Sequence, residues 1–231
     1  MTQGFTEYDT RHYLTVDVVT GYSAWAHTYD QTVHDELDLH LLASLQTVPW
    51  AQCRTAVDLG CGTGRIGTWL QGQGITQLHG IDCTPAMISQ AAVTQAYTQL
   101  CIADITRCPL PDQHYNMGIT VLATCHVADL SAFYAEAARL LRPGGFFVLL
   151  DYHPFCLLQG IPTHFESATG MPIAIANVVH LLSDYVQQGR RVNWSLLEMQ
   201  ERLVDDAWIA HRPGMARYRH HPVSFVMVWQ A

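Results

Sequence analysis

Three acidic residues lie where apolar stretches of the chain end. Asp58, Asp82 and Asp104 occupy the ends of the stretches 55–60, 77–82 and 98–104. Alternation of such stretches with helical patterns predicts parallel strands, and ligands of open α/β sheets bind outside the carboxyl ends of those strands. There, the second acid can accept both hydroxyls of a ribose and the third can accept from an adenine amino group. The pattern therefore predicts a site for an adenosine-containing ligand.

A glycine-rich turn follows the first of these strands. Glycines recur at alternate positions in Gly60-Cys61-Gly62-Thr63-Gly64, and a helical pattern begins directly afterwards. Glycine tolerates positive φ and lets backbone lie against a ligand without a Cβ in the way. The helix that follows presents unpaired amide groups and the positive end of its dipole. The turn is therefore predicted to be a nucleotide-type binding loop.

The glycines alone do not identify the nucleotide, because residues 62–67 also satisfy the GxGxxG pattern of dinucleotide sites. Asp58, two residues before the first glycine, favours a different ligand. Its charge would repel a pyrophosphate and attract a ligand that carries an ammonium and a sulfonium. These features together favour S-adenosylmethionine over a dinucleotide.

On these motifs the chain resembles the class I S-adenosylmethionine (SAM)-dependent methyltransferases, and within them the small-molecule type of ubiquinone and menaquinone biosynthesis. The resemblance runs from about residue 22 to 152 and is carried by residues 25–30, 57–64, 80–82, 103–105 and 140–145. It implies an α/β fold with a doubly wound, Rossmann-like, seven-stranded and mostly parallel sheet whose last strand is antiparallel. It also implies SAM as the cofactor.

The same resemblance implies which residues meet the cofactor. Tyr29 would reach the methionine end, Cys61 would contact the cofactor through its backbone, and Cys83 would lie beside the ribose. Ala123 would pass beneath the adenine or the methionine. The full predicted set is Tyr29, Asp58, Gly60, Cys61, Gly62, Gly64, Asp82, Cys83, Met87, Asp104, Ile105 and Ala123.

Two histidines on the expected rim are candidate catalytic bases. His126 follows the fourth strand, at about 116–123, and His153 follows the fifth, at about 146–152. A base assists methyl transfer when the acceptor is a phenol, alcohol or ammonium that must lose a proton. The alternatives are that His126 only forms a hydrogen bond to cofactor or backbone, and that His153 only shapes the turn before Pro154.

Composition narrows the class of partner. The chain has 231 residues, 49% of them hydrophobic, which suits one α/β domain. Its net charge is −8, and all 12 basic residues are arginine. An acidic, lysine-free chain argues against nucleic acid as a partner and excludes Schiff-base and P-loop chemistry. No metal site is predicted, since the adjacent pair His220-His221 would face opposite ways in a strand.

The cellular location of the protein is predicted from its N-terminal residues, its apolar stretches and its cysteines. Residues 1–12 are polar and do not form a signal peptide, and the longest strongly apolar run, 146–150, is too short to cross a bilayer. The 7 cysteines are odd in number and form no CxxC pair, which favours thiols in a reducing compartment. A cytoplasmic protein without a membrane partner is predicted, and its oligomeric state is not.

The single domain is expected to comprise an N-terminal helical cap (1–50), a SAM-binding core (51–153) and a substrate-side segment (154–231). Residues 24–46 and 173–188 read as helices, and 191–204 and 222–230 as closing strands. The arginine- and histidine-rich residues 208–221 either recognise an anionic substrate or form a solvated loop.

The predicted function is SAM-dependent transfer of a methyl group to an oxygen, nitrogen or carbon nucleophile of a small-molecule metabolite. Two other functions stay open. One is a SAM-binding sensor or assembly protein without transferase activity, and the other is an NAD-dependent oxidoreductase, which Asp58 and Asp104 disfavour.

Overall fold

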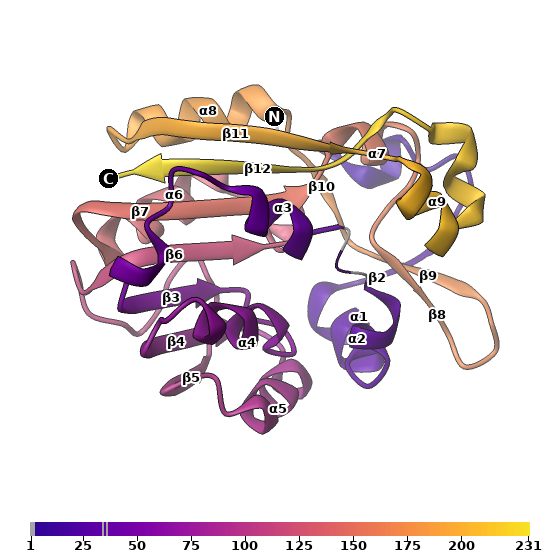
Figure 1. Ribbon diagram of the computed structural model, residues 1–231. Helices are drawn as coiled ribbons and strands as arrows, with labels where there is room; N and C mark the ends of the chain where they lie inside the picture. The colour runs from indigo at the N-terminus through magenta and orange to yellow at the C-terminus, as the bar shows by residue number, and fades with distance from the viewer. Residues whose placement is uncertain (1–2, 34, 36) are drawn as a thin grey trace.

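The computed structural model describes residues 3–33, 35 and 37–231. Figure 1 shows the chain as one α/β body with a smaller group of strands and short helices at one end. Strands and helices follow one another as β1 (Gln3–Gly4), β2 (Leu14–Val16), α1 (Val18–Trp25), α2 (Tyr29–Thr32), α3 (Leu39–Ser44), β3 (Thr55–Leu59), α4 (Arg65–Gly72), β4 (Gln77–Asp82), α5 (Pro85–Thr94), β5 (Gln99–Ile102), β6 (Tyr115–Val121), α6 (Leu130–Leu140), β7 (Leu141–Tyr152), α7 (Pro154–Leu158), β8 (His164–Glu166), β9 (Pro172–Ile175), β10 (Val178–Val179), α8 (Leu182–Arg191), β11 (Ser195–Leu203), α9 (Asp206–His211) and β12 (Pro222–Gln230).

The main sheet has seven strands in the order β11-β12-β7-β6-β3-β4-β5. Strands β5, β4, β3, β6 and β7 pair in parallel, and β12 pairs antiparallel with both β7 and β11. The predicted fold class, with its antiparallel last strand, is confirmed. A dinucleotide-binding sheet of order 3-2-1-4-5-6 has no antiparallel strand at this position, so the topology also departs from that of an oxidoreductase domain.

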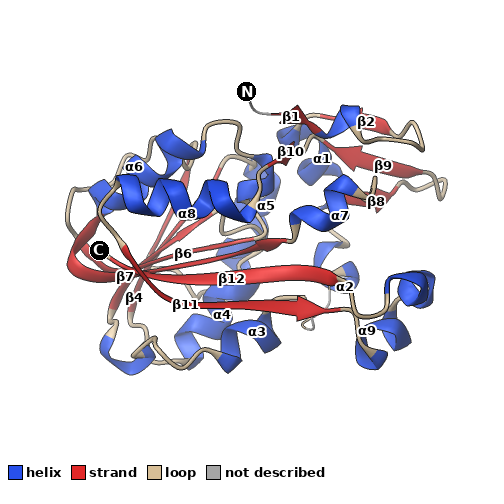
Figure 2. Ribbon diagram, turned by 90° about the horizontal axis from the view of Figure 1, so that it is seen from above, coloured by secondary structure: helices blue, strands red, loops and turns tan. Residues whose placement is uncertain are grey.

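The central strands are buried on both faces because their side chains alternate between two cores. On β7, Phe147 and Leu149 enter the core that includes residues of α6 and α8, whereas Val148 and Leu150 enter the core under α3 and α4. Figure 2 shows these two helical layers on opposite sides of the sheet. Among the described residues, no helix has the length and apolarity needed to cross a bilayer.

The segment before the core is not the single helix predicted over 24–46. It contains α1, α2 and α3, preceded by β1 and β2. Polar side chains that bond to the backbone end these helices and begin new ones. Thr32 donates to the carbonyl of Thr28 at 3.1 Å, and Asp38 accepts from the amide of Leu39 at 2.6 Å at the start of α3.

The helix predicted over 173–188 is wrong in its first half. Residues 172–175 and 178–179 form β9 and β10, and α8 begins only at Leu182. Their isoleucines and valines favour the extended backbone. Strand β9 pairs in parallel with β2 and antiparallel with β8, and β10 pairs with β1. The segments before and after the core therefore form small sheets together.

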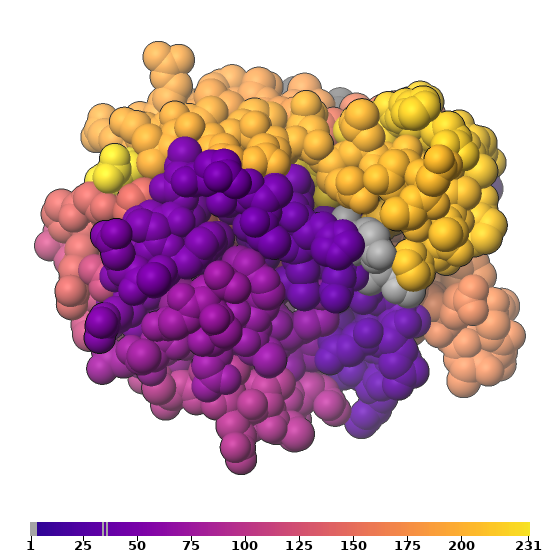
Figure 3. Space-filling view, viewed as in Figure 1, coloured from indigo at the N-terminus to yellow at the C-terminus, as the bar shows by residue number. Residues whose placement is uncertain are grey.

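Arg65, the first residue of α4, ties the glycine loop to the N-terminal segment. Its guanidinium bonds to Asp35 at 2.8 Å and also pairs with Asp38, which is fully buried. Burial raises the pKa of Asp38, and the charge of Arg65 opposes that rise. In Figure 3 the purple atoms of the N-terminal third cover this face of the molecule, below the orange atoms of the C-terminal strands.

Replacing Arg65 by methionine is expected to lower the free energy of unfolding by about 3–5 kcal/mol, because Asp38 would be left buried without its partner. Asp35→Asn, at an exposed end of the same cluster, should cost about 1 kcal/mol or less. Urea unfolding of both variants measures the difference. Equal stabilities would show that the buried pair does not hold the N-terminal segment.

Candidate functional site

The glycine loop between β3 and α4 has the backbone that its sequence requires. Gly60, Gly62 and Gly64 have φ values of +83°, +53° and +88°. A Cβ on Gly60 would lie 2.6 Å from the Cβ of Ala123, so that position also lacks room for a side chain. The amides of Gly60 and Cys61 each donate to the carbonyl of Ile81 at 2.8 Å, which fixes the loop against the end of β4.

Asp82, the last residue of β4, holds the loop from the other side. Its Oδ2 accepts from the amide of Gly62 at 3.0 Å, and its Oδ1 accepts from the amide of Thr84 at 2.8 Å. Burial raises the pKa of this carboxyl group, and the two amide hydrogen bonds oppose the rise. The carboxylate is half-buried and is positioned by backbone before any ligand arrives.

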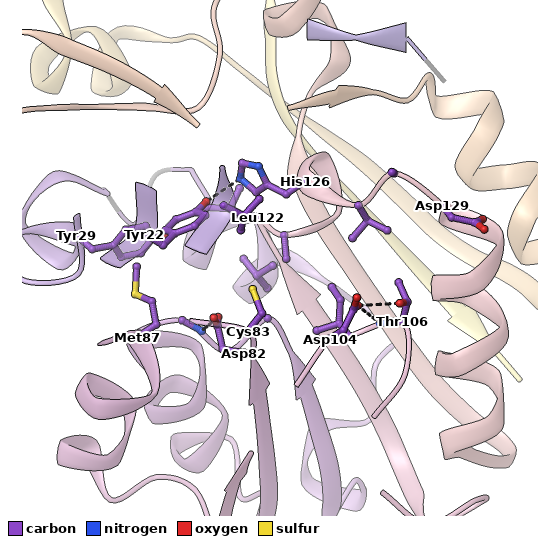
Figure 4. Close-up of a pocket in the computed structure, with 18 residues that line it drawn as sticks. Tyr22, Tyr29, Asp82, Cys83, Met87, Asp104, Thr106, Leu122, His126 and Asp129 are labelled. Atoms are coloured by element: carbon purple, nitrogen blue, oxygen red, sulfur yellow. Dashed lines mark hydrogen bonds between the residues drawn. The ribbon is translucent and has the colours of Figure 1, made fainter. Parts of the chain in front are cut away.

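A cavity of about 420 Å³ opens above this rim. Figure 4 shows Tyr22 and Tyr29 on one side of it, Asp82, Cys83 and Met87 below, and Asp104 and Asp129 toward the other end. The cavity brings together most of the predicted cofactor residues and one predicted base: Tyr29, Gly60, Gly62, Asp82, Cys83, Met87, Asp104, Ile105, Ala123 and His126.

Asp58, Cys61 and Gly64 are predicted contacts that do not line this cavity among the described residues. Asp58 is 1% exposed and accepts from the hydroxyl of Tyr97 at 2.7 Å. Burial raises its pKa to about 7, and the Tyr97 hydrogen bond opposes that rise. Asp58 is therefore bonded to a side chain inside the protein and does not line the cavity, where its charge was predicted to attract the ligand.

Tyr97 owes its position to two glycines on neighbouring elements. A Cβ on Gly67 of α4 would lie 2.3 Å from Cζ of Tyr97, and one on Gly80 of β4 would lie 2.8 Å from its Cδ1. The ring thus occupies space that only glycines leave open. Gly67, the last glycine of the GxGxxG pattern, contributes packing space for Tyr97 and does not line the cavity among the described residues.

His153 also lies outside the cavity. Its Nδ1 accepts from the amide of Phe155 at 3.1 Å as the N-cap of α7, and its Nε2 lies 2.9 Å from Glu201 Oε1. Both ring nitrogens are engaged in structural contacts. This arrangement agrees with the alternative that His153 shapes the turn before Pro154.

His126 lies in the short helical turn 124–126 after β6 and lines the cavity. Its Nδ1 lies 2.7 Å from the carbonyl of Ala176, which can only accept, so Nδ1 carries the proton of the neutral ring. Nε2 is then an acceptor and lies 2.8 Å from the hydroxyl of Tyr22. Burial lowers the pKa of His126, so the ring is uncharged at neutral pH and can accept a proton.

A second cavity, of about 410 Å³, adjoins the first and shares Tyr22, Tyr29 and Leu122 with it. Leu122 has a φ of +57°, which a bulky residue adopts only when its surroundings impose it. The remaining lining comes from the N-terminal segment, from the turn after β6, from 152–164 and from the C-terminal segment: Arg11, Trp25, Val33, Leu37, Cys125, Tyr152, Ile161, Pro162, Thr163, His164, Trp208, Arg212, Gly214, Met215, Arg217 and Tyr218.

Several residues outside the predicted cofactor set also line the first cavity: Val18, Tyr22, Thr106, Val121, Leu122, Val127, Ala128 and Asp129. Some of them had a usable signal. The rule that places ligands beyond the strand ends extends past Ala123 to the start of α6, where Asp129 caps the helix. The contact of Tyr22 with His126 could not be predicted, because it depends on how the N-terminal segment folds back.

Comparison with known proteins agrees with this architecture. Residues 57–149 match the methyltransferase domain family. A malonyl-[acyl-carrier protein] O-methyltransferase from Serratia marcescens is 31% identical over 130 residues, which cover 55% of this chain and 49% of that protein. The chain spans about half the length of the curated relatives that it matches first.

Two solved structures share the fold over most of both chains. A SAM-dependent methyltransferase from Mesorhizobium loti superposes with a TM-score of 0.66 at 20% identity, covering 85% of this chain and 98% of its own. The S-adenosylhomocysteine (SAH) complex of DhpI has a TM-score of 0.66 at 18% identity, covering 91% and 93%. Residues 57–149 therefore carry a methyltransferase domain, and the strand order and the glycine loop give the chain the fold of the SAM-dependent methyltransferases.

Proposed function

We propose that the protein transfers a methyl group from SAM to an oxygen, nitrogen or carbon nucleophile of a small molecule. The observation that carries this proposal is the cavity in which Asp82, the glycine loop and His126 meet, with a second cavity directly beside it. A donor and an acceptor need adjoining sites, since the reaction is an in-line displacement that depends on holding the two reactants in contact.

The residues present fit the cofactor. A cavity of about 420 Å³ is of the size that encloses small ligands. Asp82 would receive the ribose hydroxyls, Asp104 the adenine amino group, and Tyr29 would lie at the methionine end. When bound, SAM supplies a methyl group on a positively charged sulfur.

The chain's own part in the reaction is to position the acceptor, exclude water and accept a proton. SAM held by Asp82 and the glycine loop would supply the methyl group to the acceptor's lone pair, with SAH as the leaving group. If the acceptor is a hydroxyl or an ammonium, its proton passes to Nε2 of His126. In the structure without ligand, the hydroxyl of Tyr22 occupies the position next to Nε2 that the acceptor would take. The relative that is named an O-methyltransferase supports an oxygen acceptor as the first to test.

Calorimetry with SAM, SAH and NADH tests the cofactor, and transfer of labelled methyl from SAM to a panel of phenols and organic acids tests the activity. We expect micromolar binding of both adenosyl ligands, no binding of NADH, and labelled product. Binding without any transfer would favour the sensor or assembly protein. Binding of NADH alone would favour the function of an NAD-dependent oxidoreductase.

A further inference from the structure

We propose that the second cavity selects a methyl acceptor with an apolar, planar body and a carboxylate group, which Arg212 and Arg217 bind together with Arg11. This inference rests on the proposed function, since it names the substrate class of the same site. It is carried by the charge of the cavity wall, by the donors that its arginines retain and by the apolar side chains beside them.

The wall of the second cavity is positively charged in an acidic protein. The chain carries a net charge of −8, yet three of its 12 arginines line this cavity, and none of the described lining residues is an acid. Arg65, Arg139, Arg202 and Arg219 form ion pairs elsewhere. In the part of the chain that the structure describes, the guanidinium groups of Arg11, Arg212 and Arg217 form no ion pair, and Asp9 accepts from the backbone amide of Arg11 at 3.0 Å.

Neutral partners hold these three guanidinium groups in place. Arg212 donates from Nη2 to the carbonyl of Thr32 at 2.7 Å, and Arg217 lies 4.8 Å from the ring centroid of Tyr218. Arg11 donates from Nη1 to the hydroxyl of Tyr13 at 3.1 Å. A guanidinium has five N–H donors, so each retains donors for the two oxygens of a carboxylate.

Large apolar side chains share the same wall. Trp208, which is 5% exposed, lines the cavity together with Trp25, Tyr152 and Ile161. Aromatic and aliphatic surfaces of this kind suit a flat hydrophobic body.

The positive charge of the cavity does not come from histidine. Burial lowers the pKa of His164, and the charges of Arg212 and Arg11 lower it further, although its bond to the carbonyl of Pro162 opposes them. His164 is therefore neutral at physiological pH. Because arginine stays charged throughout, selection for the anion should not vary across neutral pH.

Cinnamate, its methyl ester and phenyl phosphate are suitable probes, titrated by calorimetry into protein saturated with SAH. We expect cinnamate to bind at least about tenfold more tightly than the ester, because a charged hydrogen bond is lost with the carboxylate. Arg212→Gln and Arg217→Gln should each weaken cinnamate by about tenfold and leave the ester unchanged.

Arg190→Gln is the matched control, since Arg190 is exposed on α8 and lines neither cavity. Equal binding of acid and ester, unchanged binding in both arginine variants, or no cinnamate binding at millimolar concentration would each overturn the proposal. If phenyl phosphate bound more tightly than cinnamate, the proposal of a carboxylate would be overturned in favour of a phosphate group. Failure of the proposed function is measured separately, because it appears either as loss of SAH binding or as SAM binding without transfer of labelled methyl, and neither readout involves cinnamate.

Discussion

Asp82→Asn is expected to weaken the binding of SAH by about a hundredfold or more. In the proposed complex the carboxylate accepts two ribose hydroxyls while it holds the amides of Gly62 and Thr84. The asparagine keeps the shape but replaces one acceptor oxygen by an NH2 group, which repels one backbone amide and no longer accepts from a ribose hydroxyl. Loss of two charge-assisted hydrogen bonds, each about 1.5–3 kcal/mol, gives an effect of this size.

Calorimetry with SAH measures the change, and thermal unfolding of the ligand-free variant shows whether the loop still folds. Asp206→Asn removes the same charge from a side chain that is 83% exposed on α9, and it should bind SAH as the wild type does. If Asp82→Asn kept wild-type affinity, the ribose would have to bind elsewhere on the rim, and the assignment of the first cavity would fail.

His126→Gln is expected to lower kcat by about 10²–10⁴ with an acceptor that must lose a proton, and to leave SAH affinity within a few-fold of wild type. Glutamine can still bond to Ala176 and Tyr22 but cannot accept a proton. Tyr22→Phe removes only the hydroxyl 2.8 Å from Nε2 and should retain the base. An unchanged kcat in His126→Gln would leave His126 with a structural role alone.

The pH dependence of kcat separates these roles. Because burial lowers the pKa of His126 below its usual 6.5, the active neutral form predominates at pH 7. Activity should be constant above that lowered pKa and decline as the pH falls through it. His126→Gln should lose this acidic limb, whereas Tyr22→Phe should keep it, which a purely structural role would not predict.

The core of the fold could be predicted because its signals are local. The bounds of β4 match the predicted stretch 77–82, and the glycine turn required positive φ wherever its glycines fall. The prediction failed where non-local pairing decides. Residues 172–175 have an apolar pattern that fits a helix or a strand. Their pairing with β8 and with β2, more than a hundred and fifty residues earlier, makes them a strand.

The residues of the site, like the elements of the fold, could be predicted where the signal is local and could not where it depends on distant parts of the chain. The acids on the rim and His126 could be found from the ends of strands, whereas burial of Asp58 behind Tyr97 depends on a residue from another element. Tyr22 and the arginine wall depend on the N-terminal segment and on residues 208–221, whose approach no local pattern encodes. Cytoplasmic location stays a prediction from the sequence.

The packing of Tyr97 against Gly67 and Gly80 has an evolutionary consequence. A substitution at either glycine alone would clash with the ring, and a small residue at position 97 alone would leave a void and Asp58 without its donor. The three positions should therefore be inherited as a set across related sequences. A homologue that lacks the last glycine of the GxGxxG pattern should also lack this tyrosine, and its loss of the motif would say nothing about its cofactor.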